Sequence, residues 1–212
     1  MKIAIIGATG RVGQAIVDEA LKRGHEVTAI ARDPSKVKAA PHLKAVKADV
    51  LDASSAATAV KGADAVISAY NPGWTNPNIR EDTTKGFTGI IGGLKKAGVK
   101  RVLFVGGAGS LVEGGGRLVD KPDFHPQWKP GALGAADALD LVRKEKDLDW
   151  TFLSPPVMLN DGERTGHYRH GKESPVRNEK GESHITVPDL AHAILDEIEK
   201  PQHIRQRFTV GY

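Results

Sequence analysis

The sequence predicts an α/β fold in which helices cover both faces of one mostly parallel sheet. Short apolar runs alternate with longer segments of helical period, and runs such as IAIIG and VLFVG are apolar throughout. Strands that are buried on both faces have this composition, and regular β-α-β order implies parallel strands joined by right-handed crossovers. At 212 residues the chain is long enough to bury a substantial core, and we expect a single domain over residues 1–212.

In the first half of the chain, strands and helices alternate strictly. The opening strand, residues 2–6, precedes a helix over residues 12–23, where apolar residues recur at helical spacing and Gly24 supplies a C-terminal cap. We then expect strands at 26–31 and 43–48, a helix at 53–60, a strand at 63–69, and a helix at 81–97 that Gly98 ends.

The second half contains the same kinds of element, separated by two long irregular segments. We expect strands at 100–105, 150–154 and 205–210, and helices at 132–146 and 188–199. The predicted arrangement is a doubly wound sheet of order 3-2-1-4-5-6, with the last strand added at the edge. The irregular segments, residues 106–131 and 155–187, each follow a strand. We therefore expect them at the carboxyl edge of the sheet, where they form the acceptor side of a ligand site.

Composition narrows the classes of partner. The net charge is +4 and the basic residues are interleaved with acidic ones, so phosphate-bearing small molecules fit better than nucleic acid, which stays a minor alternative. No apolar run could span a bilayer and the chain opens directly on a strand, so we expect a cytoplasmic protein without a membrane partner. The chain has no cysteine, and His167, His170 and His184 lack acidic neighbours at metal-binding spacing, so we expect no metal site.

The spacing Gly7-x-x-Gly10-x-x-Gly13 follows the first strand and opens the first helix. In such a βαβ unit, Gly7 permits the sharp turn, Gly10 lets a ligand approach the backbone, and Gly13 lets the helix pack on the strand. The helix N-terminus offers free N–H groups to an anion, and Arg11 adds a formal cation. The motif predicts a cradle for a dinucleotide pyrophosphate; a tight turn without a ligand is the alternative.

The end of the second strand indicates which dinucleotide. A carboxylate here accepts from the ribose 2′-hydroxyl of NAD, whereas an arginine accommodates the 2′-phosphate of NADP. The strand ends in Arg32, and Asp33 comes one residue later, where we expect it to cap the next turn. NADP is therefore favoured over NAD, with a solvated surface role as the alternative for Arg32. After the third strand, Asp49 and Val50 are placed to meet the adenine, and Asp52 is expected to cap the following helix.

Two further groups of residues fall at the same edge of the predicted sheet. Ser68, Ala69 and Tyr70 follow the fourth strand, beside the ribose–nicotinamide half of the cofactor, although Tyr70 could equally pack under its own loop. The loop DFHPQWKPG carries Phe124, His125, Trp128 and Lys129, which could wall a flat acceptor. Simple packing within that loop is the alternative.

With these residues placed, the chain resembles the atypical branch of the short-chain dehydrogenase/reductase superfamily. The resemblance rests on the glycine motif, Arg32 at its strand end, DVLD and LSPP. Within that branch the chain is similar to NADH-flavin reductases related to biliverdin-IXβ/flavin reductase, through LDWTFLSPP, GERTGHYRHG and the ending EIEKPQHIRQRFTVGY. The resemblance covers nearly the whole chain.

The resemblance implies a Rossmann fold that binds NAD(P), with Ser154, Pro155 and Pro156 lining the nicotinamide and a flavin or similar flat acceptor stacked there. The family label names NADH, while Arg32 argues for NADPH. The cofactor-binding positions carried over are Gly7, Thr9, Gly10, Arg11, Val12, Gly13, Arg32, Asp49, Val50, Ser68, Ala69, Tyr70, Ser154, Pro155 and Pro156.

The helix expected between the fifth and sixth strands lacks the Tyr-x-x-x-Lys pair with which typical members of the superfamily activate a carbonyl. A literal match at Tyr168 and Lys172 lies in a glycine-interrupted loop, so we interpret it as chance, and Ser110 is the one weak catalytic candidate. Reduction of a ketone needs a positioned acid, whereas a reduced flavin can take its proton from solvent.

We therefore predict hydride transfer from NADPH to a free flavin or quinone-like acceptor, with the flavin as a substrate rather than a tightly bound group. A catalytically silent NADP-binding sensor that regulates a partner protein is the alternative. A sugar-nucleotide epimerase or dehydratase is disfavoured because the chain is short and lacks the Tyr-Lys pair.

Overall fold

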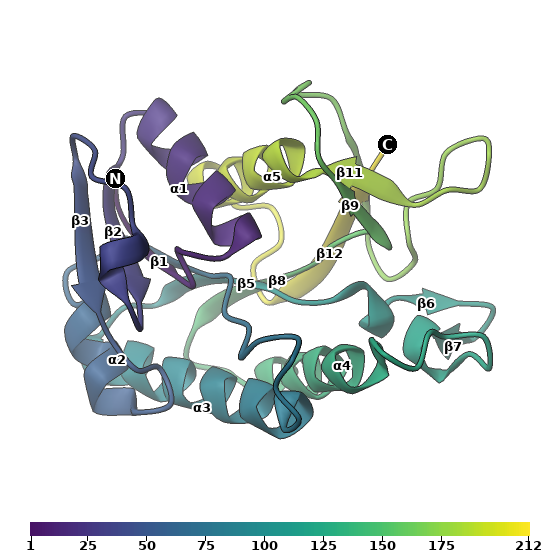
Figure 1. Cartoon of the computed structure of the whole chain (residues 1–212), viewed down its shortest axis with the longest axis horizontal. Helices are drawn as coiled ribbons and strands as arrows, with labels where there is room; N and C mark the ends of the chain where they lie inside the picture. Colours follow the sequence, from purple (N-terminus) through teal and green to yellow (C-terminus); the bar gives the residue numbers. More distant parts are fainter.

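The computed structural model describes residues 1–212 around a central eight-stranded sheet of order β10-β12-β8-β5-β4-β1-β2-β3 (Figure 1). All neighbours in this sheet are parallel except β10 and β12. The order of the first six predicted strands is 3-2-1-4-5-6, as expected. The strands are β1 (Lys2–Ile6), β2 (Glu26–Ala31), β3 (Leu43–Lys47), β4 (Ala65–Ser68), β5 (Arg101–Val105), β8 (Asp149–Ser154), β10 (Arg169–Gly171) and β12 (Gln206–Gly211).

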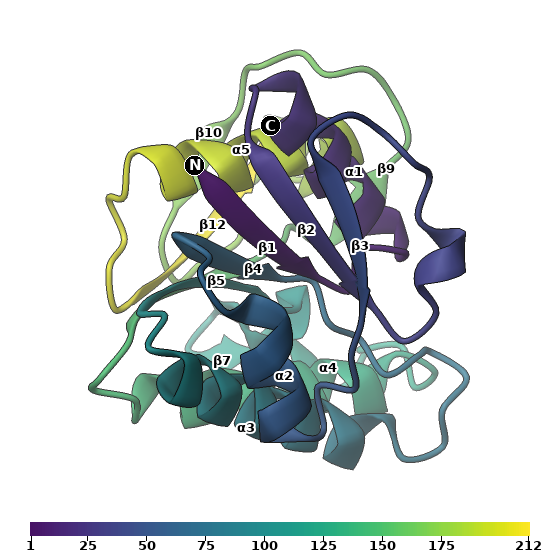
Figure 2. The same cartoon turned by 90° about the vertical axis from the view of Figure 1, so that its left-hand side faces the viewer.

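Helices cover both faces of the sheet, which confirms the predicted fold class. On one face lie α1 (Arg11–Lys22) and α5 (Val187–Glu199), which pack against each other; on the other lie α2 (Ala53–Val60), α3 (Ile79–Ala97) and α4 (Lys129–Arg143) (Figures 1 and 2). None of these helices is both long and apolar enough to cross a membrane.

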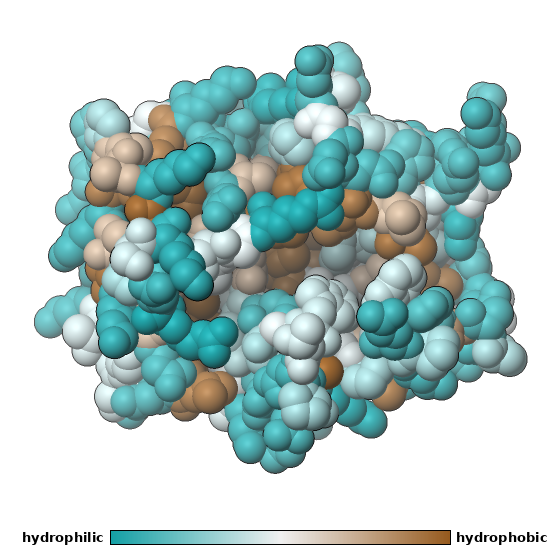
Figure 3. All heavy atoms as spheres, in the orientation of Figure 1, coloured by the Kyte–Doolittle hydropathy of each residue, from teal (hydrophilic) through white to brown (hydrophobic).

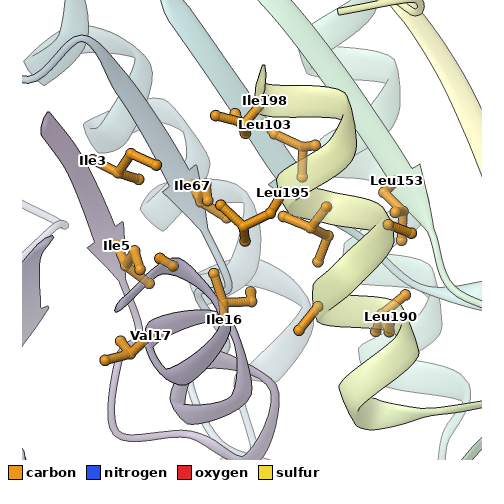
Figure 4. Close-up of a cluster of buried hydrophobic side chains, with 14 of the residues drawn as sticks. Ile3, Ile5, Ile16, Val17, Ile67, Leu103, Leu153, Leu190, Leu195 and Ile198 are labelled. Atoms are coloured by element: carbon orange, nitrogen blue, oxygen red, sulfur yellow. The ribbon is translucent and has the colours of Figure 1, made fainter. Parts of the chain in front are cut away.

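Alternate residues of the central strands enter two different cores, which explains why these strands are apolar throughout. Ile3 and Ile5 of β1 face α1 and α5, where Leu195 lies between the helix and the sheet (Figure 4). Ala4 and Ile6 belong to the second core, under α2, α3 and α4. These side chains are at most 2% exposed.

The long irregular segments contain more regular structure than the sequence predicts. The sequence predicts the last strand of the chain at the edge of the sheet. In the structure, β10 lies outside β12 and takes the edge position instead. Its pairing partner lies about forty residues away, and a three-residue strand has no local pattern that could announce it. The segments also hold two small sheets, β6 (Val112–Glu113) with β7 (Gly116–Arg117) and β9 (Met158–Asn160) with β11 (His184–Thr186).

Two helices also begin earlier than predicted. The third helix starts at Ile79 rather than residue 81, and α4 spans Lys129–Arg143 rather than residues 132–146. Pro130 stands in the first turn of α4, where proline costs nothing because the helix provides no acceptor for its missing N–H. The proline that we assigned to a loop is thus part of the helix start.

Candidate functional site

The turn between β1 and α1 presents a helix N-terminus. Gly7 has a φ of 78°, and its N–H donates to Ile30 O across 3.1 Å. The first helical hydrogen bond of α1 runs from Gln14 N to Gly10 O at 2.8 Å, so the N–H groups of Arg11, Val12 and Gly13 have no partner within the helix. The first turn carries no acidic side chain. Its free N–H groups and the helix dipole therefore favour an anion.

The three glycines of the motif are required for different reasons. A Cβ on Gly13 would lie 2.0 Å from Gly7 O, and a Cβ on Gly7 would lie 2.5 Å from Ala69 O. Backbone atoms of the protein therefore exclude a side chain at both positions. At Gly10 the nearest atom would be Gly7 O at 3.4 Å, an ordinary contact. The protein leaves space at Gly10 that a side chain would fill. This arrangement fits a dinucleotide pyrophosphate.

The other residues of the turn face different surroundings. Thr9 is partly exposed and its carbonyl accepts from Gln14 Nε2 at 3.1 Å, while Val12 packs against the core under α1. The Arg11 guanidinium donates two hydrogen bonds to Leu159 O and forms an ion pair of 2.6 Å with Asp161. Arg11 thus connects the cradle to the segment after β8, a contact that the sequence did not reveal.

Arg32 and Asp33 differ in their availability to a ligand. Arg32 is exposed at the end of β2 and makes no hydrogen bond or ion pair. The Asp33 carboxylate accepts from the Ser35 hydroxyl at 2.6 Å and from Ser35 N at 3.2 Å, which confirms its predicted capping role. These hydrogen bonds lower the pKa of Asp33. Arg32 thus has no partner within the protein, whereas Asp33 already engages its Oδ1 in the following turn.

The segment after β3 is ordered by its own side chains. Asp49 Oδ1 accepts from Leu51 N at 3.0 Å, and Asp52 caps α2 by accepting from Ser54 N at 2.8 Å, as predicted. Val50 is buried, and its carbonyl oxygen would lie 2.0 Å from a Cβ on Gly89 of α3. Asp49 is the exposed member of the predicted pair Asp49 and Val50.

After β4, Tyr70 packs against α3. Its hydroxyl donates to Asp82 O at 3.2 Å, and its ring would lie 2.1 Å from a Cβ on Gly86 of α3. Burial, with the nearby Asp82 charge, raises the pKa of Tyr70, so the phenol stays neutral. Ser68 is buried and its hydroxyl accepts from Tyr70 N at 3.4 Å, whereas Ala69 is partly exposed.

Ser110 and Ser154 meet at the carboxyl ends of the neighbouring strands β5 and β8. Their hydroxyl oxygens are 3.1 Å apart, both residues are at most 3% exposed, and Ser110 Oγ also donates to Gly107 O at 2.9 Å. The Ser110 hydroxyl thus bonds within the protein and not at its surface. Pro155 and Pro156 are also buried. Arg207, which sequence reasoning missed, contacts both serines; a charged residue within the apolar run RFTVG was the available signal.

Large exposed apolar side chains gather at the carboxyl edge of the sheet. They follow β3, β4, β5 and β8, and their exposed fractions range from 45% to 65%: Leu51, Trp74, Trp128, Val157 and Met158. Figure 3 shows a hollow in this face in which apolar surface is visible between polar rims. An apolar hollow with a polar rim is typical of ligand-binding surfaces. Of these residues, only Trp128 was singled out from the sequence; its ring centroid lies 4.8 Å from that of His125.

The literal Tyr-x-x-x-Lys match does not form a catalytic pair in this structure. Tyr168 and Lys172 flank β10, so they share no helical face. The Tyr168 hydroxyl donates to Asp196 of α5 at 2.5 Å, and burial together with this carboxylate raises the pKa of Tyr168. Lys172 is exposed. We find no cluster of three or more His, Asp or Glu side chains that could hold a metal ion.

Comparison with known proteins agrees with this reading of the cradle. A family model described as NAD(P)H-binding matches residues 7–201. The uncharacterized protein YwnB of Bacillus subtilis is 40% identical over 99% of this chain and 98% of its own.

Two solved structures also resemble the chain over its full length. A candidate epimerase from Bacteroides thetaiotaomicron is 47% identical with a TM-score of 0.93, over 100% of this chain and 96% of its own. A candidate NADH-flavin reductase from Streptococcus pneumoniae is 41% identical with a TM-score of 0.87, over 100% of this chain and 99% of its own. The chain therefore belongs to the NAD(P)H-binding family, a group of oxidoreductase-like proteins in the atypical branch of the short-chain dehydrogenase/reductase superfamily.

Proposed function

We propose that this protein is a reductase that transfers a hydride from NADPH to a free flavin or quinone-like flat acceptor, which it binds as a substrate. The observation that carries the proposal is the combination of the dinucleotide cradle with exposed apolar side chains in the segments that follow β5 and β8. Val157 and Met158 come directly after β8, and Trp128 ends the long segment between β5 and α4; we assign the ends of β5 and β8 to the nicotinamide half. Flat aromatic acceptors bind to apolar and aromatic surfaces of this kind.

NADPH is preferred over NADH in this proposal because of the end of β2. Arg32 has no partner within the protein, and a guanidinium can hold a phosphate through two parallel hydrogen bonds. Asp33, the residue that could accept from a ribose hydroxyl, already accepts from Ser35. The residues that would hold the rest of the cofactor are the cradle glycines, Arg11 and Asp49.

The proposed reaction needs no general acid or base from the protein. The cofactor, when bound, supplies the hydride. A flat acceptor spreads the arriving negative charge over its ring, so no positioned acid is needed, and α4 carries no tyrosine that could act as one. The residues of the hollow orient the acceptor and exclude water from it.

Two other functions make different predictions. A catalytically silent sensor would bind NADPH with no turnover on any flavin or quinone. The relative named as an epimerase raises the second alternative, and an epimerase would convert a nucleotide sugar while regenerating its cofactor. The missing Tyr-Lys pair on α4 argues against the second alternative.

The test is a steady-state comparison of NADPH and NADH, each with FMN, riboflavin and a soluble quinone. Wild-type protein should oxidise NADPH faster than NADH with at least one acceptor. Arg32→Ala should lose about 1–3 kcal/mol of NADPH binding and little NADH binding, because a charge-assisted bond to the 2′-phosphate is removed. Lys61→Ala, which removes an exposed cation beyond the C-terminus of α2, serves as the control.

Each result has a distinct meaning. Equal losses for NADPH and NADH in Arg32→Ala would refute the 2′-phosphate role. Tight NADPH binding without turnover on any acceptor would refute the reductase and support the sensor.

A further inference from the structure

Arg207 is a buried cation that contacts Ser110 and Ser154, close to the carboxyl ends of β5 and β8 that we assign to the nicotinamide half of the candidate site. It lies on β12, next to β8, and its side chain is 1% exposed. Phe208 and Val210 of the same strand enter the core under α1 and α5, so Arg207 faces the opposite side of the sheet, as Phe152 does on β8. Ser154 and Arg207 thus come from the neighbouring strands β8 and β12, and they meet Ser110, which lies in the segment five residues after the end of β5.

The hydrogen bonds of this cluster run in one direction, because a guanidinium can only donate. Arg207 Nη1 donates to Ser110 O at 3.2 Å and lies 3.3 Å from Ser154 Oγ and 3.4 Å from Ser110 Oγ. The Ser110 hydroxyl proton goes to Gly107 O at 2.9 Å, which leaves Ser154 to donate to Ser110 Oγ across 3.1 Å. Arg207 therefore orients both hydroxyls and the backbone at Gly107 and Ser110.

The other side of the guanidinium meets a carboxylate that compensates for the burial of its charge. Arg207 Nε donates to Glu173 Oε1 at 3.2 Å, Nη2 donates to Oε2, and Arg143 of α4 adds a second cation at 3.1 Å. Arg207 is the first cause of the lowered pKa of Glu173. Removing one partner from such a pair is costly, because the buried charge loses its compensation. The guanidinium is thus held from both sides, and its position is well defined.

We propose that Arg207 is a positioning residue for the nicotinamide end of the cofactor site. By donating to Ser110 and Ser154, it holds the segments after β5 and β8 in the arrangement that receives the nicotinamide. The inference rests on the proposed cofactor site. It concerns one end of that site, since Arg207 contacts neither the glycine cradle nor the end of β2 that would hold the adenosine half.

The chain contains a matched control for this role. Arg101 at the start of β5 is also buried in the sheet, with a side chain 12% exposed. It donates to the Thr151 hydroxyl at 2.7 Å and pairs with Glu197 at 3.2 Å, so like Arg207 it bonds a hydroxyl and a carboxylate, although its own side chain is more exposed and its carboxylate partner more buried. Arg101 stands at the amino edge of the strands, away from the candidate site. Arg101→Met and Arg207→Met should both lower stability.

The experiment measures binding rather than turnover. Dissociation constants are determined for NADPH and for adenosine 2′,5′-bisphosphate, which carries the adenosine half of NADPH and lacks the nicotinamide. We expect Arg207→Met to weaken NADPH binding about tenfold or more, because the segments that receive the nicotinamide lose the hydrogen bonds that hold them, while the bisphosphate binds within about twofold of wild type. Arg101→Met should leave the ratio of the two constants unchanged.

Two milder variants keep the test valid if Arg207→Met does not fold. Arg207→Lys preserves the charge and should recover part of the NADPH affinity. Ser154→Ala removes one acceptor of the guanidinium and should shift the ratio of the two constants in the same direction as Arg207→Met. Unfolding in urea is measured for every variant, so that a loss of stability is separated from a loss of binding.

The outcomes distinguish the inference from the proposed function. Equal weakening of both ligands in Arg207→Met, or the same selective loss in Arg101→Met, would overturn the positioning role while the cofactor site stands. An unchanged ratio in the Arg207 and Ser154 variants would do so as well. If wild-type protein binds neither ligand, the proposed function fails and this inference fails with it.

Discussion

Gly13 packs against Gly7 so closely that a Cβ atom on Gly13 would lie 2.0 Å from the Gly7 carbonyl oxygen. This contact joins the start of α1 to the end of β1, and it makes Gly13 a requirement of folding. Gly10, three residues earlier, has room for a Cβ in the protein alone. The same motif therefore combines a folding constraint with a binding constraint, and mutations can separate the two.

Gly13→Ala should destabilise the protein by about 1–3 kcal/mol, since the methyl group forces the helix away from the strand. Gly10→Ala should cost about 1 kcal/mol, because alanine is a poorer N-cap residue than glycine but its Cβ would meet only an ordinary contact, yet it should abolish NADPH binding. Urea unfolding and NADPH titration measure the two effects. Gly116→Ala, with no atom within 4 Å of its Cβ, is the control. Wild-type NADPH affinity in Gly10→Ala would argue against the cradle.

Asp161→Asn should tighten NADPH binding. The Asp161 carboxylate lies 2.6 Å from Arg11 and is 96% exposed, so it competes with a pyrophosphate for the guanidinium while contributing little to stability. We expect affinity to rise about 2–5-fold and stability to change by less than about 1 kcal/mol, as is usual for exposed ion pairs. The control Asp147→Asn breaks the exposed 3.0 Å pair with Lys95. It should leave NADPH affinity unchanged and should change stability by less than about 1 kcal/mol. A weaker NADPH complex in Asp161→Asn would show that the pair helps to build the site.

Acid should weaken the contact between the two long segments. Arg177 and Lys121 lower the pKa of Glu113 from its usual 4.5 to about 2, through hydrogen bonds of 2.6 Å each. Because the folded pKa is depressed, this contribution is complete above pH 4.5 and is lost as the pH falls toward 2. Solvent screening limits it to about 1 kcal/mol.

The measurement for Glu113 is urea unfolding of wild type and Glu113→Gln between pH 7 and pH 3. The stability difference should be present at neutral pH and should narrow steadily below pH 4.5. Glu81→Gln, which breaks an exposed pair with Lys85, controls for general charge effects of one carboxylate. A difference for Glu113→Gln that stays constant over this range would contradict the assignment.

Tyr168→Phe and Lys172→Met should leave reductase turnover unchanged. Tyr168 donates to Asp196 on α5 and Lys172 is exposed, so neither belongs to the proposed site. Losing the hydrogen bond to Asp196 should cost Tyr168→Phe about 1 kcal/mol of stability. Steady-state NADPH oxidation is the measurement. A fall of about tenfold or more in kcat, with stability retained, would assign the motif a catalytic role, since one positioned acid accounts for such factors.

The features that could be predicted from the sequence are those encoded by neighbouring residues. The apolar runs, the helical periods and Gly7, Gly10 and Gly13 identify the strand order and the cradle, because burial on both faces and a tight turn each demand particular residues within a few positions. Asp33 and Asp52 cap the turns that follow them, as predicted, for the same reason. At these positions, the interactions of residues close together in the sequence were sufficient to predict the structure.

What only the tertiary structure decided depends on residues far apart in the chain. Arg207 meets Ser110 across 97 positions, and Arg11 meets Leu159 across 148. The run RFTVG marks Arg207 as unusual, but no local pattern identifies the partner in either contact, because each contact is created when the sheet places separate strand ends and loops side by side. The sequence by itself determined an α/β fold with a dinucleotide cradle. The cluster of Ser110, Ser154 and Arg207 and the partners of the charged groups follow from packing, since buried hydrogen bonds form only where the assembled fold brings donor and acceptor together.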